Sequence, residues 1–300
     1  MPTTIAQRRL DTLTTVTDAR ARLWRPFPRQ VADVLCVDSA VAEMRPRIHS
    51  RFAIALVRSP SVVRVEASSS LVVDRPSILL VPAWQLFALR VDRGVDEAGV
   101  TLLLDASRAG GLAVIDCPSL IDDAEAGAQL AALLAQLRRP VRAVECETAG
   151  RSLVERLALR GRPVPPARKR SVPSPLVAIR NHLRVNQGSP VSIAEMVRLS
   201  GLSEYHLIRA FHHVFGLPPH AYHLRLRLAL ACDLLERGLS VSAVAYESGF
   251  ADQSHLSRKF KAVYGLTPAS WAEAAGTRER KVVPLVAHPG DSARRSAWQA

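Results

Sequence analysis

The sequence predicts an α+β chain of two domains, a strand-rich N-terminal domain and an all-helical C-terminal domain. Short apolar runs fill residues 31–116, a stretch rich in proline and arginine follows at 161–174, and the helical pattern after it is duplicated. A chain of 300 residues is long enough for two domains. We expect domains at 1–160 and 175–276, joined by the linker 161–174 and followed by a mobile basic tail at 277–300.

Short runs of Val, Leu and Ile predict the strands of the first domain. Ser, Pro, Gly or Asp residues separate the runs, as turns between strands require. Many short strands at this spacing are typical of a β-sandwich or β-barrel. The predicted strands are Val31–Val37, Ile48–Val57, Val62–Val65, Leu71–Val73, Ile78–Val81, Leu86–Val91 and Val100–Leu104.

Two helical segments close the first domain, Ala124–Arg139 and Glu145–Arg160, each with leucines at helical spacing. The apolar face of the first helix packs either on the β-domain or against a second copy of the chain. The stretch Gly161–Pro175 then holds five prolines and four basic residues in 15 positions. Proline restricts its own backbone and that of the preceding residue, so this stretch predicts a semi-extended linker.

The surplus of positive charge is confined to the second half of the chain. Residues 1–137 carry 15 basic and 15 acidic side chains, so the formal net charge of +13 arises entirely after them. A basic surplus of this size favours a polyanionic partner, nucleic acid above all.

The sequence lacks the motifs of several other classes of protein. The four cysteines, Cys36, Cys117, Cys146 and Cys232, have neither zinc-site nor redox spacing. No apolar run is long enough for a membrane span, and residues 1–13 have no signal-peptide core. Phosphate-binding glycine loops, nucleophile elbows and zinc-protease motifs are absent from the sequence as well. We therefore expect a cytoplasmic protein that is not an enzyme and that needs neither a metal nor a cofactor.

The C-terminal domain contains an internal repeat. Residues 203–219 match residues 252–268 at a constant offset, with His, Leu, Arg, Phe, Val, Gly and Pro in corresponding places. Each copy consists of two short helices joined by a glycine turn, which is the pattern of a helix-turn-helix unit. The predicted helix-capping residues are Ser192 and Ser203 in the first unit and Ser240 and Asp252 in the second.

A leucine-rich segment, Pro218–Arg237, separates the two units. A helix of about 20 residues is about 30 Å long, close to the roughly 34 Å of one turn of B-DNA. A stiff spacer of this length could set the second helix of each unit into successive major grooves. The same helix would also supply the core of the domain.

These units resemble those of the AraC/XylS family of transcription regulators. The stretch GFADQSHLSRKFKAVYGLTP, residues 249–268, is close to that family's C-terminal signature, and residues 192–219 fit its first helix-turn-helix. The resemblance implies a bacterial regulator that binds double-stranded DNA, most commonly as an activator that also contacts RNA polymerase. It further implies a cupin-like N-terminal domain that binds a small-molecule effector and forms a homodimer.

By similarity to the family, the DNA-contacting positions fall on the second helix of each unit. Arginine can form two hydrogen bonds with guanine and glutamine two with adenine, while tyrosine and isoleucine offer apolar contact to thymine. His212 and Lys261 are expected at phosphates, which position the protein without specifying sequence. Arg209 could instead pair with Glu195 inside the domain. The candidate DNA-binding residues are Tyr205, Ile208, Arg209, His212, Gln253, Ser254, His255, Arg258 and Lys261.

The sequence leaves the role of the N-terminal domain open between effector sensing and dimerisation alone. His49 and Trp84 are the candidate effector-binding residues. His49, Arg51 and Arg90 could meet an anionic ligand, and positions on the surface are the expected alternative for all three. His49 is the one histidine of this half, so a catalytic metal centre is not expected. The alternative to a regulator is a cupin-type enzyme fused to a DNA-binding module.

Overall fold

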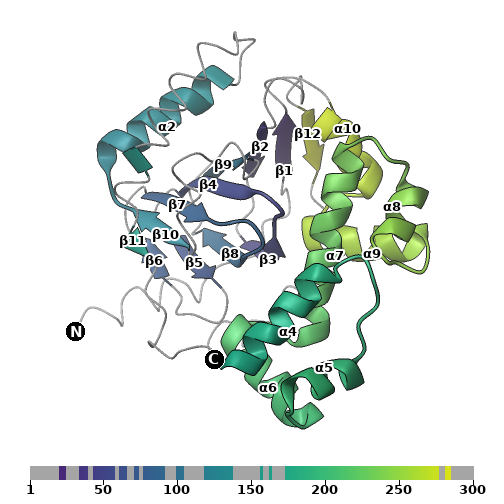
Figure 1. Ribbon diagram of the computed structural model, residues 1–300. Helices are drawn as coiled ribbons and strands as arrows, with labels where there is room; N and C mark the ends of the chain where they lie inside the picture. The colour runs from purple at the N-terminus through teal and green to yellow at the C-terminus, as the bar shows by residue number, and fades with distance from the viewer. Residues whose placement is uncertain are drawn as a thin grey trace.

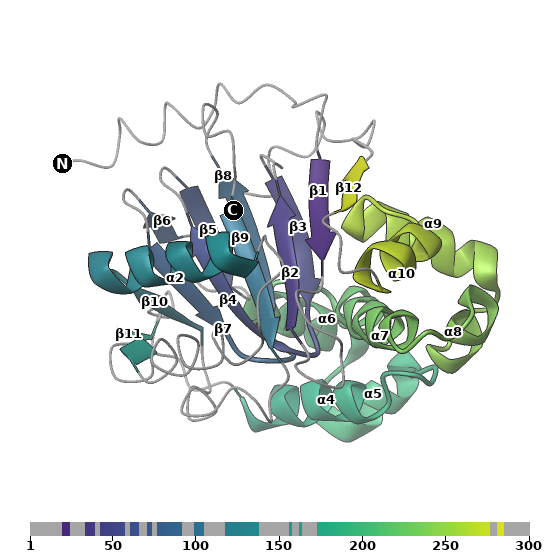
Figure 2. The same ribbon diagram turned by 90° about the horizontal axis from the view of Figure 1, so that it is seen from above.

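The computed structural model places a β-rich domain beside a helical domain (Figure 1). It describes residues 20–24, 34–39, 43–57, 61–65, 71–73, 77–91, 99–104, 118–137, 156–157, 162–163, 173–276 and 281–284. The two domains are in contact, and the helical domain lies along one side of the strands (Figure 2).

An eight-stranded antiparallel sheet forms the larger layer of the β-rich domain. Its central strand β4 is buried along its whole length, with Ile54 opposite Leu80 of β7 and Leu102 of β9. The helix α2, Ala124–Leu137, contacts β7 and β4. In sheet order the strands are β11 (Arg162–Pro163), β10 (Ser119–Ile121), β7 (Ser77–Val81), β4 (Phe52–Val57), β9 (Gly99–Leu104), β2 (Val34–Ser39), β1 (Arg20–Trp24) and β12 (Lys281–Pro284).

A four-stranded antiparallel sheet forms the second layer. Its strands, in sheet order, are β3 (Glu43–Ile48), β8 (Leu86–Val91), β5 (Ser61–Val65) and β6 (Leu71–Val73). Phe87 and Val73 of this sheet share one apolar cluster with Ala53, Leu79 and Leu103 of the larger sheet. Apolar side chains from two sheets thus fill one core, which explains the continuous apolar runs of the central strands.

The described parts of the predicted strands are found in the structure with one error, and residues 31–33 of the predicted strand Val31–Val37 lie outside the described residues. The run Ile48–Val57 is not one strand, because β3 ends at Ile48, β4 begins at Phe52, and residues 49–51 form a corner between them. His49 and Arg51, the two polar residues that interrupt the run, lie in this corner and contact the helical domain instead of pairing in a sheet.

Two strands lie in segments that the sequence analysis assigned to the linker and to the tail. β11 lies in the expected linker and pairs with β10, and β12 lies in the expected tail and pairs with β1. Of the predicted helix Glu145–Arg160, only Arg156 and Leu157 are among the described residues, and both are helical.

The helical domain consists of two groups of helices with the long helix α7 running between them (Figure 1). Within the part of the chain that the structure describes, no helix combines the length and the apolar character needed to span a bilayer. The helices are α4 (Ser174–Val185), α5 (Ile193–Ser200), α6 (Glu204–Phe215), α7 (Pro219–Glu236), α8 (Val241–Glu247), α9 (Gln253–Tyr264) and α10 (Pro268–Gly276).

The cores of both helical groups continue into the β-rich domain. Phe211, Phe215 and Tyr222 form the aromatic centre of the first group, and their apolar cluster includes Ile48 and Leu86 of the small sheet. The cluster around Phe260, Tyr264 and Trp271 in the second group is continuous with the core between the two sheets. The two domains are therefore joined by apolar packing as well as by polar contacts.

Candidate nucleic-acid interface

Two helix pairs, α5 with α6 and α8 with α9, are built by the same local rules. Each first helix begins at a serine whose hydroxyl accepts from a backbone amide, Ser192 from Glu195 and Ser240 from Ala243, both at 3.2 Å. These bonds satisfy one of the free amides of the first helical turn. The predicted caps of the first helices are therefore confirmed.

The second helix of each pair is capped as predicted and ends at glycine. The Ser203 hydroxyl accepts from the His206 amide at 3.4 Å, and an Asp252 carboxylate oxygen accepts from the His255 amide at 2.7 Å. Both helices stop where a glycine adopts a left-handed conformation, Gly216 with φ 79° and Gly265 with φ 75°. α6 and α9 therefore have the same length and the same ends.

One face of each second helix packs into the core. Leu207 and Phe211 of α6 and Leu256 and Phe260 of α9 are all 0% exposed. These residues lie four apart in each helix, so they share one face and direct the opposite face to solvent.

The outer face of α6 carries the candidate residues of the first unit. Tyr205, 62% exposed, Arg209 and His212 lie on the surface, and Ile208 is half-buried. The Arg209 guanidinium donates to the Tyr205 hydroxyl at 2.6 Å and lies 5.3 Å from the centre of its ring. These two side chains hold each other in place before any ligand arrives.

The alternative partner of Arg209 has a different role. The Glu195 carboxylate accepts a hydrogen bond from the His182 ring at 2.9 Å, which ties α5 to α4. The neighbouring His206 lies three residues after the capping Ser203, and its Nδ1 lies 2.9 Å from the Ser203 hydroxyl. Arg209 is therefore directed to the surface rather than to an acid within the domain.

The outer face of α9 carries the candidate residues of the second unit. Gln253, Ser254, Arg258 and Lys261 are exposed. His255 is half-buried, with its ring edge against Phe250 at 5.4 Å between ring centres. This face is polar and basic along two to three turns.

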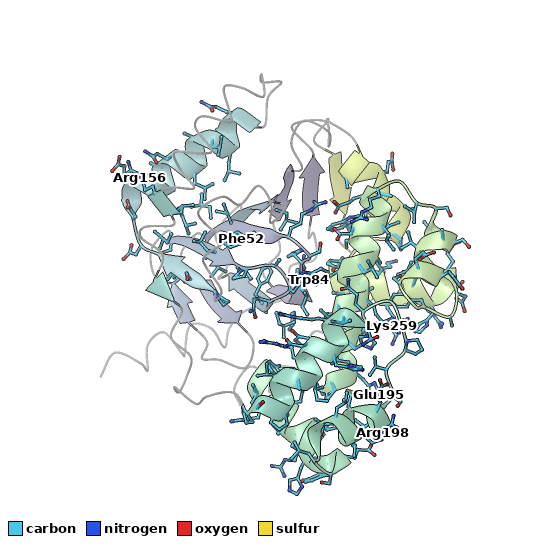
Figure 3. The ribbon with its side chains drawn as sticks, viewed as in Figure 1. Phe52, Trp84, Arg156, Glu195, Arg198 and Lys259 are labelled. Atoms are coloured by element: carbon cyan, nitrogen blue, oxygen red, sulfur yellow. The ribbon has the colours of Figure 1, made fainter. Side chains whose placement is uncertain are left out.

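Two further exposed basic residues of the helix pairs are not among the candidates. Lys259 lies on α9 between Arg258 and the buried Phe260, and Arg198 lies near the end of α5 (Figure 3). The sequence could have indicated both as candidates, since they are basic residues in helices of the repeated units. Neither matches a position that the resemblance marked.

The Asp252 cap offers a direct check of how α9 is held. We expect Asp252→Ala to destabilise the start of α9 by about 0.5–2 kcal/mol, because the His255 amide loses its acceptor. Hydrogen exchange of the first-turn amides of α9 should speed up accordingly, whereas Asp252→Asn, which keeps an acceptor oxygen, should exchange like the wild type. Equal protection in the alanine and asparagine variants would contradict this account of the cap.

The candidate effector residues lie where the β-rich domain meets the helices. The Trp84 amide donates to the His49 carbonyl at 2.7 Å, and Arg184 of α4 donates to the Trp84 carbonyl at 2.5 Å. Trp84 has φ 64°, a left-handed conformation that is rare for a bulky residue, and these two bonds hold it there. Figure 3 shows Trp84 between the sheets and the helices.

The corner at residues 49–51 is directed to α7. Arg51 is 5% exposed, so the expected alternative of a surface position is wrong for this residue; the Arg90 side chain lies outside the described residues. Withdrawal from solvent, and then the charges of Arg47 and Arg51, lower the pKa of His49 to about 3, so its ring is neutral at physiological pH. The hollow that His49 lines with Asp233 and Glu236 measures about 10 Å³, room for a single water molecule.

Comparison with known proteins concerns mainly the helical domain. A family model described as a helix-turn-helix domain matches residues 196–274. The chain is 34% identical over 97 residues to the probable transcriptional regulator LumQ of Photobacterium leiognathi, over 32% of this chain and 39% of that protein. It is 35% identical over 89 residues to the uncharacterized HTH-type transcriptional regulator YbfI of Bacillus subtilis (strain 168), over 29% of this chain and 32% of that protein. The match thus spans less than half the length of either relative.

A solved structure resembles most of the chain. ToxT from Vibrio cholerae O395 aligns with 86% of this chain and 97% of that chain, with a TM-score of 0.50 and 14% identity, which shows a shared fold. LumQ and YbfI are both named as transcriptional regulators.

Proposed function

We propose that this chain, whose C-terminal domain belongs to the AraC/XylS family of helix-turn-helix regulators, binds double-stranded DNA at specific sequences and regulates transcription. One observation carries the proposal above the others. Two helices of equal length with corresponding caps, α6 and α9, keep their apolar faces in the core and direct a polar face to solvent, which in α9 is basic. A helix with such a face fits the major groove of B-DNA.

The exposed side chains support a division of roles. Arg258 and Gln253 can each form two hydrogen bonds to a base edge, and Tyr205 and Ile208 can contact a thymine methyl group. His212, Lys259 and Lys261 would contact phosphates. We assign Ser254, His255 and Arg209 to the same interface, although in the free chain the Arg209 guanidinium is bonded to the Tyr205 hydroxyl.

The spacer helix supports insertion of both units into one DNA face. α7 has 18 residues, and at about 1.5 Å per residue it spans about 27 Å. Successive major grooves on one side of B-DNA are about 34 Å apart.

The N-terminal domain would regulate the DNA-binding domain. Its two facing antiparallel sheets are compatible with a cupin-like domain that binds a small-molecule effector or joins two copies of the chain. His49 and Trp84, our candidates for effector binding, lie at the contact with the helices. Because the hollow beside His49 has room for only one water, an effector would have to displace one of these side chains and would thereby act on the DNA-binding domain. We favour activation of transcription, with RNA polymerase as the further partner.

Selection from random duplex DNA tests the proposal. We expect the full chain to enrich a site with two short boxes whose centres are about one helical turn apart. If four phosphates are contacted, affinity should fall by roughly a hundredfold between about 50 and 200 mM salt, because binding releases counterions. Lys261→Ala should lower that salt slope by about one without changing the enriched sequence.

Recovery of no enriched sequence by the wild-type chain would overturn the proposal. An enriched site with a single box would retain DNA binding and contradict the use of both units.

A further inference from the structure

The loop that precedes the first helix-turn-helix unit touches the backbone of the second unit. A Cβ built on Gly188, in the loop between α4 and α5, would lie 2.7 Å from the carbonyl oxygen of Glu247. A Cβ built on Gly249, in the turn between α8 and α9, would lie 2.5 Å from the carbonyl oxygen of Gly188. Side chains do not approach backbone oxygens this closely, so the contact requires glycine on both sides.

One face of α7 holds both segments of this contact. His223 is 5% exposed, and its Nε2 lies 3.1 Å from the Asn186 carbonyl oxygen, to which it can only donate. One turn further along α7, the Arg227 Nε donates to the Ser248 carbonyl at 2.8 Å, and its guanidinium carbon lies 4.3 Å from the centre of the Phe250 ring. The loop that precedes the first unit is thus bonded to His223, and the turn of the second unit is bonded to Arg227.

The loop and the turn that α7 holds lie close to the DNA-facing helices α6 and α9. The turn at residues 248–250 leads directly into the cap of α9, and the loop at residues 186–192 leads into α5, which is joined to α6 by a short glycine turn. α5 contacts α6, and α8 contacts α9. A shift of the loop against the turn would therefore change the separation and the angle between α6 and α9.

We propose that Asn186, Gly188, His223, Arg227 and Gly249 form an inter-unit clamp that sets which spacing between two DNA boxes the chain accepts. The inference rests on the proposed function, because it assumes that both units bind DNA. The clamp fixes the relative position of α6 and α9 before DNA is bound. Binding to a correctly spaced site therefore has no entropic cost for ordering the two helices. At a site with another spacing, the helices cannot move to reach both boxes. The five residues act through α6 and α9 and are positioning residues.

Gly188→Ala is the variant that isolates the clamp. Gly188 does not have a positive φ, so alanine meets the Glu247 carbonyl but imposes no backbone strain of its own. Ser189→Ala is the matched control, since the Ser189 side chain is exposed in the same loop. The probes are the duplex selected by the wild-type chain, the same duplex with one or two base pairs inserted between the boxes, and duplexes with a single box.

We expect Gly188→Ala to bind the selected duplex about tenfold more weakly, since it is no longer held in the binding geometry. Its affinity for single-box duplexes should stay within about twofold of the wild type, because each unit remains folded. The penalty for inserted base pairs, each of which turns one box by about a tenth of a turn, should shrink in the variant. Arg227→Met, which keeps an apolar stem but removes the bond to Ser248, should give the same pattern.

Unchanged spacing preference in both variants, or an equal loss on single-box and double-box duplexes, would overturn the clamp. Failure of the wild type to select any duplex would instead count against the proposed function.

Discussion

Arg51→Met is expected to weaken the docking of the two domains by about 3–5 kcal/mol, which is the typical cost of removing one partner from a buried ion pair. The Arg51 guanidinium lies 2.5 Å from a carboxylate oxygen of Glu236, and the two side chains are 6% and 3% exposed. Methionine fills a similar volume but leaves the Glu236 carboxylate buried without its cation.

Two neighbours of this ion pair supply no positive charge. Asp233, 3.9 Å from Arg51, is a second acid and accepts from the Ser50 hydroxyl at 2.8 Å. Trp271 donates its indole N–H to Glu236 at 3.3 Å but carries no charge. Two carboxylates of α7 would then face each other and the apolar clusters, which favours separation of the domains so that water can reach both.

Small-angle scattering measures the expected separation as a larger radius of gyration of the variant. Hydrogen exchange should be faster at residues 49–51 and at Trp84, whose amide bonds to His49. Arg51→Met combined with Glu236→Gln should recover most of the docking, because the buried charge is removed as well. Arg237→Met, an exposed arginine beside Glu236, is the control and should leave the docking unchanged.

An Arg51→Met chain as compact and as protected as the wild type would show that the Arg51–Glu236 pair is not needed to hold the domains together. The apolar packing between the domains is extensive, since Ile48 and Leu86 join the core of the first unit.

The helical domain could be predicted from the sequence because its determinants are local. A serine or aspartate cap acts on an amide three residues away, and a glycine stop acts within one turn. The repeat showed each of these signals twice. Leu207 and Phe211 could likewise be assigned to the core from their spacing alone, and both are fully buried.

The strands were visible as apolar runs, but their partners were not. β1, which pairs with β2 and β12, reads RARLW and has no apolar run of its own. Its partner β12 lies about 260 residues further along the chain, and no short-range pattern in the sequence predicts such a pairing. The same limit applies to β11, where a proline-rich stretch pairs with β10.

The domain contact was the least predictable part of the molecule. Arg51 and Glu236 lie on different domains, and each is common on protein surfaces, so neither signalled burial. The interruption of the run Ile48–Val57 by His49 and Arg51 was the one visible sign. A buried pair of opposite charges is specified by three-dimensional structure rather than by a local motif.

The second large effect is expected at the DNA-facing surface. Arg258→Ala should weaken binding to the selected duplex by about 1–3 kcal/mol and remove the preference at one base pair. Arg258 is exposed on α9, away from the buried Leu256 and Phe260, so its loss should not disturb the fold. Competition binding with duplexes changed one base pair at a time measures both effects, and hydrogen exchange of α9 checks that the helix is intact.

The repeat supplies a matched comparison for Arg258. Arg209 occupies the corresponding place in α6, but its guanidinium is engaged by the Tyr205 hydroxyl and ring. An arginine that must leave these contacts to reach a base gains less on binding, so we expect Arg209→Ala to lose less affinity than Arg258→Ala. Tyr205→Phe, which removes the hydroxyl acceptor, should then narrow the difference between the two arginines.

Arg258→Lys separates base reading from charge. Lysine keeps the positive charge but lacks the planar pair of donors that matches guanine, so it should retain the salt dependence and still lose the preference at one base pair. A lysine variant with full preference would mean that Arg258 contacts phosphate, and Gln253 would then be the base-reading residue of α9. Equal, sequence-independent losses from Arg258→Ala and Lys259→Ala would have the same meaning, since phosphate contacts weaken binding to all sequences alike.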